Sequence, residues 1–180
     1  MQQSPEVEDA KRDLAEMEDT LEEYLAFAKG LSEERPSEVD LVALAKEVAA
    51  ETARSGANVQ VNTADAAVTP GRARALKRCL ANLIDNAAAH GDKVRVSVRG
   101  EAEYVFVDIE DDGPGIPEEL YEDAFRPFSR LDETRTRNTK GVGLGLAIAR
   151  DVARGHGGDV ILSASALGGL RATLRLPRPA

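Results

Sequence analysis

Apolar residues recur every three or four positions from the N-terminus to Leu31, with charged residues between them. Such a narrow stripe is typical of a helix in a coiled coil or a four-helix bundle. One helix cannot bury the stripe alone, so we expect partner helices; docking on its own domain is the alternative. Gly30 and residues 33–36 end this helix and form a linker. The stripe consists of Val7, Ala10, Leu14, Met17, Leu21, Tyr24, Ala28 and Leu31.

The rest of the chain mixes helical and strand patterns. Helical spacing predicts a helix from the capping residue Asp40 to about Arg54, and a second helix that follows Pro70-Gly71 and ends near Ala89. A third helix begins at a glycine-rich turn and ends near Arg154. Residues 111–140 have no steady period and are predicted to form a long loop, which in a compact domain is usually functional or mobile. Strands are predicted at 59–61, 93–99, 104–110, 160–164 and 170–176.

Charge is unevenly distributed along the 180 residues. Residues 1–38 carry 12 acidic and 4 basic side chains, a net charge of −8, whereas the whole chain carries −9. The rest of the chain is therefore nearly neutral, and an acidic chain is a poor partner for a nucleic-acid backbone. The lone Cys79 excludes an internal disulfide. There is no apolar run of about 18 residues and no signal peptide pattern, so we expect a cytoplasmic chain without a membrane span.

The second predicted helix carries two asparagines one turn apart, Asn82 and Asn86, and ends at His90. Two amides on one face can offer oxygens to a hard cation or donate hydrogen bonds to phosphate. Taken alone, such a pair is more often solvated surface, and a histidine at a helix end is favourable with the helix dipole.

The predicted loop and the turn after it hold further candidate chemistry. The segment Asp111–Pro117 follows a hydrophobic strand, and Asp112 could accept a hydrogen bond from an amino group; a tight turn is the ordinary alternative. Phe125 and Phe128 could anchor the loop or belong to a minor core. The glycines of 141–145 precede a helix, where unpaired N–H groups and the helix dipole favour phosphate; a turn that only packs the helix against a sheet is the alternative. Four bases lead into that turn: Arg130, Arg135, Arg137 and Lys140.

Four motifs follow one another along the chain: Asn82 with Asn86, the Asp111–Pro117 segment, Phe125 with Phe128, and Gly141–Gly145. In this order they resemble the N, G1, F and G2 boxes of sensor histidine kinases, a family within the wider group of gyrase, Hsp90 chaperones and MutL. The resemblance covers residues 37–180, and it implies an α+β fold, a two-layer α/β sandwich known as the Bergerat ATP-binding fold. Residues 1–36 resemble the second helix and linker of the family's dimerisation domain, which forms a helical hairpin.

The resemblance implies that the chain binds ATP and Mg²⁺. Asn86 would bind the metal through its side-chain oxygen, with Asn82 close to the metal and the phosphates. His90 would lie against adenine or ribose, and Asp112 would accept the adenine amino group. Residues 118–140 would form the ATP lid. The further residues implied in nucleotide binding are Gly113, Gly115, Ile116, Phe128, Arg130, Arg135, Lys140, Gly141, Val142, Gly143, Leu144 and Gly145.

Two departures from the family pattern limit what this chain is expected to do. The family often has Lys or Arg just before the position of His90, where this chain has Ala89, so a lid base such as Arg130 or Arg135 would have to reach the phosphate. The phosphoacceptor motif, similar to His-Glu-Leu-Arg-Thr-Pro, is absent, and His156 is expected to be structural. The chain as given would therefore bind Mg-ATP and would not phosphorylate itself.

The implied partners are the dimerisation helices of the same kinase, in a homodimer, and the receiver domain of a response regulator. The parent protein would be anchored in the inner membrane. Three alternatives remain at this stage: an anti-sigma-type serine kinase, an interaction module in which nucleotide only stabilises the fold, and a dinucleotide-binding domain. The last is disfavoured because its glycines should directly follow a strand, whereas Gly141–Gly145 follow a polar loop.

Overall fold

The computed structural model describes residues 34–63, 67–129 and 143–179. Residues 35–180 make up one compact unit, and the predicted helix of residues 1–31 lies outside the described residues. The helices are α2 (Leu41–Arg54), α3 (Ala73–His90), a single 3-10 turn η1 (Glu118–Leu120), α4 (Tyr121–Ala124) and α5 (Gly145–Gly155). The strands are β1 (Ser37–Asp40), β2 (Asn58–Thr63), β3 (Val68–Gly71), β4 (Lys93–Gly100), β5 (Tyr104–Asp111), β6 (Asp159–Ala164) and β7 (Leu170–Pro177).

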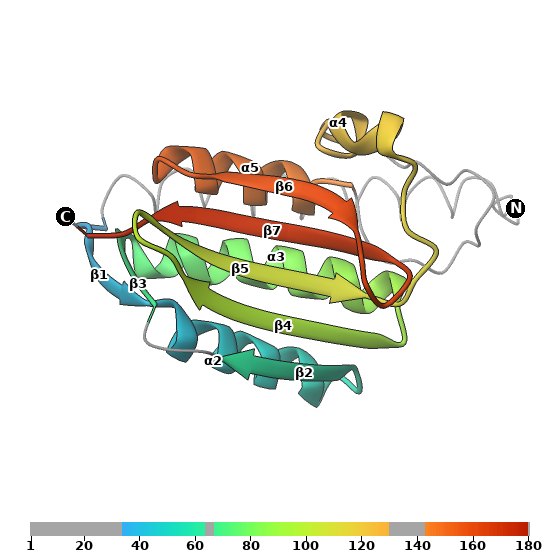
Figure 1. The fold of residues 1–180 in the computed structure, drawn as a ribbon, viewed down its shortest axis with the longest axis horizontal. Helices are drawn as coiled ribbons and strands as arrows, with labels where there is room; N and C mark the ends of the chain where they lie inside the picture. Colours follow the sequence, from blue (N-terminus) through green and yellow to red (C-terminus); the bar gives the residue numbers. More distant parts are fainter. Residues whose placement is uncertain (1–33, 64–66, 130–142, 180) are drawn as a thin grey trace, which may run out of the picture. The chain divides into compact units, whose positions relative to one another are not determined.

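Five strands form one mixed sheet in the order β2-β4-β5-β7-β6. Strand β2 pairs with β4 in parallel, and every other neighbouring pair in this sheet is antiparallel. The long helices α2, α3 and α5 all cover the same face of the sheet (Figure 1). The predicted two-layer α/β sandwich is confirmed.

The core lies between these two layers because alternate strand residues point toward the helices. Strand β4 buries Val94, Val96 and Val98, which pair across the ladder with residues of β5. Helix α3 supplies the opposing apolar face, where Cys79 is a free, fully buried thiol. Other large, fully buried side chains include Leu41, Val48, Leu76, Leu80, Leu83, Ile84, Ile109, Leu174 and Leu176.

Helix α2 begins where the sequence predicts. The Asp40 carboxylate accepts hydrogen bonds from the backbone N–H groups of Val42 and Ala43 at 2.9 and 3.1 Å, which satisfies two donors of the first turn. Strands β4 and β5, with their connecting turn, are also confirmed.

The two-stranded sheet of β1 and β3 was not predicted. Pro70-Gly71 precedes α3, as expected, but it also ends β3, which pairs with β1. The predicted loop 111–140 contains η1 and α4. Helix α5 runs from Gly145, the third glycine of the turn, to Gly155, which agrees with a glycine-led helix ending near Arg154. Each missed element has only three or four residues, which is too short for a period to show in the sequence.

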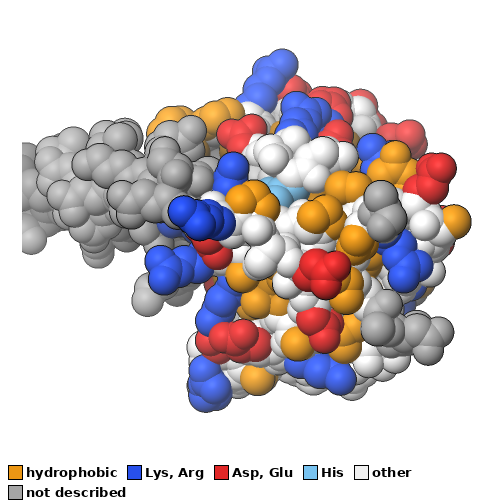
Figure 2. Space-filling view, turned by 90° about the vertical axis from the view of Figure 1, so that its left-hand side faces the viewer, with side chains coloured by type: hydrophobic (Ala, Val, Ile, Leu, Met, Phe, Trp, Pro, Cys, Tyr) orange, Lys and Arg blue, Asp and Glu red, His pale blue; other side chains and the backbone are white. Residues whose placement is uncertain are grey.

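The four sequence motifs lie at the end of the molecule where β5 and α3 terminate and α5 begins, on the right in Figure 1. Figure 2 shows the opposite end, where basic, acidic and hydrophobic side chains are interspersed. That end therefore shows no large patch of one charge among the described residues.

Candidate nucleotide-binding site

Three approaches bring the four motifs together, and at two of them, Gly113 and Gly143, a side chain would clash with backbone atoms. An ideal Cβ on Gly113 would lie 2.5 Å from the carbonyl oxygen of His90, so the Asp111–Pro117 segment packs against the end of α3. An ideal Cβ on Gly145 would lie 3.8 Å from the carbonyl oxygen of Asn82, so the start of α5 passes beside the first asparagine. The N-box helix therefore contacts both glycine-rich segments.

The third approach joins the F box to the glycine-rich turn. The Phe128 N–H donates to the Gly143 carbonyl at 3.1 Å. Gly143 has φ of 76°, and an ideal Cβ there would lie 2.9 Å from the carbonyl oxygen of Ser129. Phe128 itself has φ of 63°, a conformation uncommon for a bulky residue and often found at functional sites.

Asn82 carries an unusual buried donor. Its side-chain nitrogen is buried and has no hydrogen-bond partner among the described residues. An unpaired buried donor costs free energy, and in native structures it usually has a specific partner such as a ligand or water. Asn86, one turn further along α3, is partly exposed, and His90 is exposed at the helix end.

The two neighbouring aspartates of the G1 segment occupy different environments. Asp111 is buried, with 3% of its surface exposed. Its Oδ1 accepts hydrogen bonds from the backbone N–H groups of Gly113 at 2.8 Å and Leu170 at 3.2 Å. Burial raises the pKa of Asp111 and outweighs these two hydrogen bonds, which act in the opposite direction.

Asp112, the residue expected to contact adenine, lies beside the start of β4. Its Oδ1 accepts a hydrogen bond from the backbone N–H of Lys93 at 2.8 Å. Its side chain is partly exposed. The pattern Asp-x-Gly-x-Gly is also met by Asp111, Gly113 and Gly115, and not by Asp112. That spacing makes Asp111 a second candidate for the adenine contact.

The turn between β6 and β7 supports Asp111 and was not recognised in the sequence. Gly169 donates its N–H to the Asp111 carbonyl at 3.1 Å. An ideal Cβ on Gly169 would meet the Asp111 side chain and would lie 2.6 Å from the Gly113 nitrogen. Gly115, with φ of 69°, packs against the same glycine. The floor of the site is therefore made by two glycine-containing turns in contact.

The other predicted site residues fall into two groups. Ile116 and Leu144 are partly exposed beside the glycines of their motifs, and Phe128 exposes 52% of its surface. Several predicted residues lie outside the described residues, so the structure does not place them: Arg130, Arg135, Lys140, Gly141 and Val142.

A dedicated metal centre of acidic, histidine or cysteine side chains is not part of this site. Among the described residues, no group of three or more His, Cys, Asp or Glu side chains could hold a metal ion. Mg²⁺ bound with a nucleotide needs few protein ligands, because phosphates and water complete its coordination. The amide oxygen of Asn86 fits such a role.

A surface cleft of about 390 Å³ lies beside the F box and not over the motif cluster. It is bordered by α4 and α5, and its lining includes Phe125 and Arg150 but not Asn82, Asn86, Asp111 or Asp112.

The described residues form no helix that is both long and apolar enough to cross a bilayer.

A two-layer sandwich with these glycine-rich segments at one end defines a class of nucleotide-binding ATPases. Residues 71–180 match the family model described as "Histidine kinase-, DNA gyrase B-, and HSP90-like ATPase", and the chain belongs to this family. Within it, the similar proteins are sensor histidine kinases. The chain is 41% identical over 168 residues to the sensor histidine kinase GtrS of Pseudomonas aeruginosa, in a match that covers 93% of this chain and 34% of the relative.

Solved structures of histidine kinase domains have the same fold as this chain. The ATP-binding domain of PrrB from Mycobacterium tuberculosis superposes with a TM-score of 0.68 at 30% identity, covering 81% of this chain and 98% of that domain. The histidine kinase domain of the E. coli osmosensor EnvZ gives a TM-score of 0.63 at 33% identity, covering 82% and 92%. The chain spans about a third of the length of GtrS.

Proposed function

We propose that this chain is the catalytic part of a sensor histidine kinase and that it binds Mg-ATP at the cluster formed by the four motifs. The observation that carries this proposal is that the Asp111–Pro117 segment packs against the end of α3 at His90, while the start of α5 passes beside Asn82, whose buried amide nitrogen has no partner among the described residues. A phosphate oxygen can accept from that amide, and the N-terminus of α5 adds favourable backbone dipoles.

In this proposal Asp111, rather than Asp112, accepts the adenine amino group. Both described hydrogen bonds to Asp111 fall on Oδ1, which leaves Oδ2 available as an acceptor among the described residues. A buried acceptor gives discrimination between bases, because an unmatched partner would leave it unpaired. Gly113, Gly115 and Ile116 shape the adenine pocket, and His90 lies against adenine or ribose.

Phosphoryl transfer depends mainly on positioning and charge neutralisation. Asn86 holds Mg²⁺ through its amide oxygen, and Asn82 and Gly143–Gly145 bind the phosphates, together with Phe128, Arg130, Arg135 and Lys140. The bond between the γ-phosphorus and its bridging oxygen breaks, ADP leaves, and a phosphorus–nitrogen bond forms to a histidine on a dimerisation helix. Neither histidine of this chain lies in an acceptor motif.

The partners in this proposal follow from the kinases that the chain resembles. Residues 1–36 belong to the dimerisation domain and residues 37–180 to the catalytic domain, and the phosphohistidine passes its phosphate to a response regulator. The catalytic domain works on the cytoplasmic side of a membrane-anchored parent. Supplying the missing acceptor helix separately is expected to restore phosphorylation, whereas the chain alone is expected to acquire no label on histidine from γ-labelled ATP.

The first experiment is a calorimetric titration with a non-hydrolysable ATP analogue, with and without Mg²⁺. We expect Mg²⁺-dependent binding that is weakened at least about tenfold by Asp111→Asn, the equivalent of one lost hydrogen bond to a charged group. Asp111→Asn should fold, since an amide oxygen can still accept from Gly113 and Leu170 and the buried charge is removed.

The matched control is Asp112→Asn, which keeps an acceptor for the Lys93 N–H. It should bind the analogue as the unaltered chain does. A loss of binding in Asp112→Asn but not in Asp111→Asn would restore the assignment made from the sequence. Absence of binding in the unaltered chain would overturn the proposed function.

A further inference from the structure

Arg150 joins three elements beside the proposed site. It lies on α5, and its guanidinium donates to both carboxylate oxygens of Glu122 on α4, at 2.7 and 3.2 Å. Its Nε donates to Asp159 Oδ1 at the start of β6, at 3.0 Å. The guanidinium carbon also lies 4.1 Å from the centroid of the Phe125 ring. Arg150 thus connects residues 121–129, which we call the F-box segment, to α5 and to the sheet.

The contacts of Arg150 require a guanidinium. A planar fork can bind one carboxylate with two parallel hydrogen bonds, bind a second carboxylate and stack on an aromatic ring at the same time. Lysine could satisfy only part of this set. The Arg150 and Asp159 side chains are 14% and 24% exposed, so water screens this ion pair less than one on the open surface, whereas Glu122 is 79% exposed.

Arg154, one turn further along α5, provides a contrast. It also contacts Asp159, at 3.3 Å, but its side chain is 54% exposed. Within the described part of the chain, the structure gives it no hydrogen bond to Glu122 and no stacking on the Phe125 ring. The link between the F-box segment and α5 therefore depends on Arg150 and not on the general positive charge of this helix.

The F-box segment leads directly to one side of the nucleotide site. From Phe125 the chain runs to Phe128, whose N–H donates to Gly143. Gly143 is two residues before α5, the same helix that carries Arg150. The segment is thus fastened to the α5 region at two points, the Phe128–Gly143 hydrogen bond and the Arg150 cluster. Movement at the second point would displace the first, and with it the glycine backbone that faces phosphate.

We propose that Arg150 is a positioning residue for nucleotide phosphates: by binding Glu122, Asp159 and the Phe125 ring, it fixes residues 121–129 on α5 and so sets the position of Gly143–Gly145. This inference rests on the proposed ATP-binding function. Arg150 acts through the backbone that it holds, and it does not itself contact the nucleotide. The adenine end, built on Asp111 and the β6–β7 turn, is independent of it.

This division predicts a selective loss of binding. In Arg150→Met, affinity for the Mg²⁺-loaded ATP analogue should fall roughly tenfold or more, since small misplacements of binding groups are costly. Affinity for adenosine, which lacks phosphates, should stay within about twofold. Arg150→Lys should lie between Arg150→Met and the unaltered chain. Arg154→Met, the matched control, should bind both ligands normally.

A nucleotide-free measurement tests the anchor itself. Hydrogen exchange at the Phe128 amide, which is bonded to Gly143, should be faster in Arg150→Met than in Arg154→Met. If Arg150→Met does not fold, Glu122→Gln replaces it. Glu122 is 79% exposed, so its substitution leaves the packing of the core unchanged. Glu122→Gln should weaken analogue binding in the same selective way.

The outcomes separate this inference from the proposed function. If the unaltered chain binds the analogue but Arg150→Met weakens adenosine and analogue equally, or neither, the positioning role is overturned and the proposed function stands. If the unaltered chain binds no analogue, the proposed function fails, and the positioning role fails with it. Selective loss of analogue binding together with faster exchange at Phe128 supports both.

Discussion

At the scale of single residues, three consecutive acids at the end of β5 have three different roles. Glu110 points to the face of the sheet away from the helices, Asp111 points inward, and Asp112 lies beyond the strand. Glu110 and Asp111 point in opposite directions because successive side chains of a strand lie on opposite faces of the sheet. Neighbouring carboxylates thus differ in exposure and in partners, and a change at one position does not substitute for a change at the next.

Gly169 is the residue where a single methyl group should do most harm to the site. In Gly169→Ala the new Cβ would meet the Asp111 side chain and the Gly113 nitrogen, and backbone atoms cannot move aside cheaply. We expect a loss of about 1–3 kcal/mol in the free energy of unfolding, together with weaker analogue binding, measured by denaturant unfolding and calorimetry.

Gly155→Ala is the control for this substitution. Gly155 lies in the last turn of α5, and nothing is within 4 Å of an ideal Cβ there. Alanine favours the helix by up to about 1 kcal/mol, so this variant should be unchanged or more stable. Equal destabilisation by both substitutions would contradict the packing of Gly169 against Asp111.

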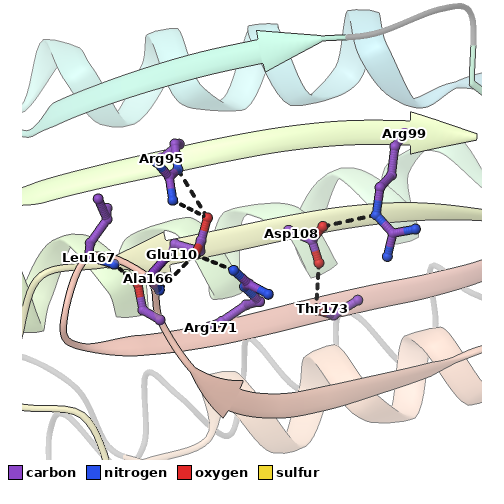
Figure 3. Close-up of polar contacts among 9 residues, drawn as sticks. Arg95, Arg99, Asp108, Glu110, Ala166, Leu167, Arg171 and Thr173 are labelled. Atoms are coloured by element: carbon purple, nitrogen blue, oxygen red, sulfur yellow. Dashed lines mark hydrogen bonds and ion pairs between the residues drawn. The ribbon is translucent and has the colours of Figure 1, made fainter.

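At the scale of elements, the outer face of the sheet is held by a polar network across β4, β5 and β7 (Figure 3). Glu110 accepts from Arg95 at 2.7 Å, from Arg171 at 2.7 Å and from the Ala166 N–H at 3.1 Å. Asp108 is bound by Arg99 and Thr173 in the same manner. This network ties the β6–β7 turn to β5 from the side opposite Asp111.

The Glu110 network predicts a dependence of stability on pH. Burial alone would raise the pKa of Glu110, but hydrogen bonds from Arg171, Arg95 and Ala166 outweigh it and hold the pKa below the ordinary value of 4.5. A lowered pKa in the folded state means that the stabilisation is complete above pH 4.5 and is lost as the pH falls below it.

Glu110→Gln should therefore lower the free energy of unfolding by about 1–3 kcal/mol at pH 7. The difference from the unaltered chain should shrink as the pH falls below 4.5, measured by urea unfolding at several pH values. Glu101→Gln is the control, since Glu101 is 58% exposed and should change stability little. A difference that stays constant down to pH 3 would show that the Glu110 charge is not involved.

His156 links two helices, as expected for a structural histidine. The backbone N–H of Arg72, at the start of α3, can only donate, so His156 Nε2 must accept at 3.1 Å. The proton then lies on Nδ1, which donates to the Val152 carbonyl at 2.7 Å. The end of α5 thereby caps α3, which has no side-chain cap of its own.

His156→Ala should lower the free energy of unfolding by about 1 kcal/mol, because the part-buried Arg72 N–H loses its acceptor. The folded variant should bind the ATP analogue with unchanged affinity, because His156 lies away from the four motifs. For stability, His90→Ala is the comparison: His90 is exposed, and its loss should change the free energy of unfolding by less than about 0.5 kcal/mol. Equal stability losses in the two variants would contradict this assignment.

At the scale of the whole molecule, the chemistry and most of the acidity lie in different parts of the sequence. Residues 35–180 form one compact unit that holds all described residues of the proposed site. The chain's net charge of −9 comes mostly from residues 1–38, which carry −8. Binding and stability should therefore be properties of the 35–180 unit.

A fragment of residues 35–180 is expected to fold alone and to bind the ATP analogue within about twofold of the full chain, because no described site residue is removed. Calorimetry and thermal unfolding of the two proteins would test this. Sedimentation of both would show whether residues 1–34 bring about self-association. A fragment that is unfolded, or that no longer binds, would show that the segment before Arg35 is part of the folding unit.

The sequence alone determined the elements with long, regular periods. The apolar spacing of α2 and α3 and the alternation in β4 and β5 predict these elements to within a few residues, because each buries one face over several turns or pleats. The order of the four motifs was enough to identify the family. These features depend on local pattern, which a single chain displays without its partners.

Only the tertiary structure decided features that join distant positions. The β1–β3 pair joins segments that α2 and β2 separate in the sequence, and its strands are too short to show a period. The burial of Asp111 depends on the β6–β7 turn and on Leu170, whose N–H donates to its carboxylate, and both lie far from this aspartate in the sequence. The Arg150 cluster likewise brings together α4, α5 and β6. Burial and pairing across the fold set these contacts, because the groups that make them are far apart in the sequence.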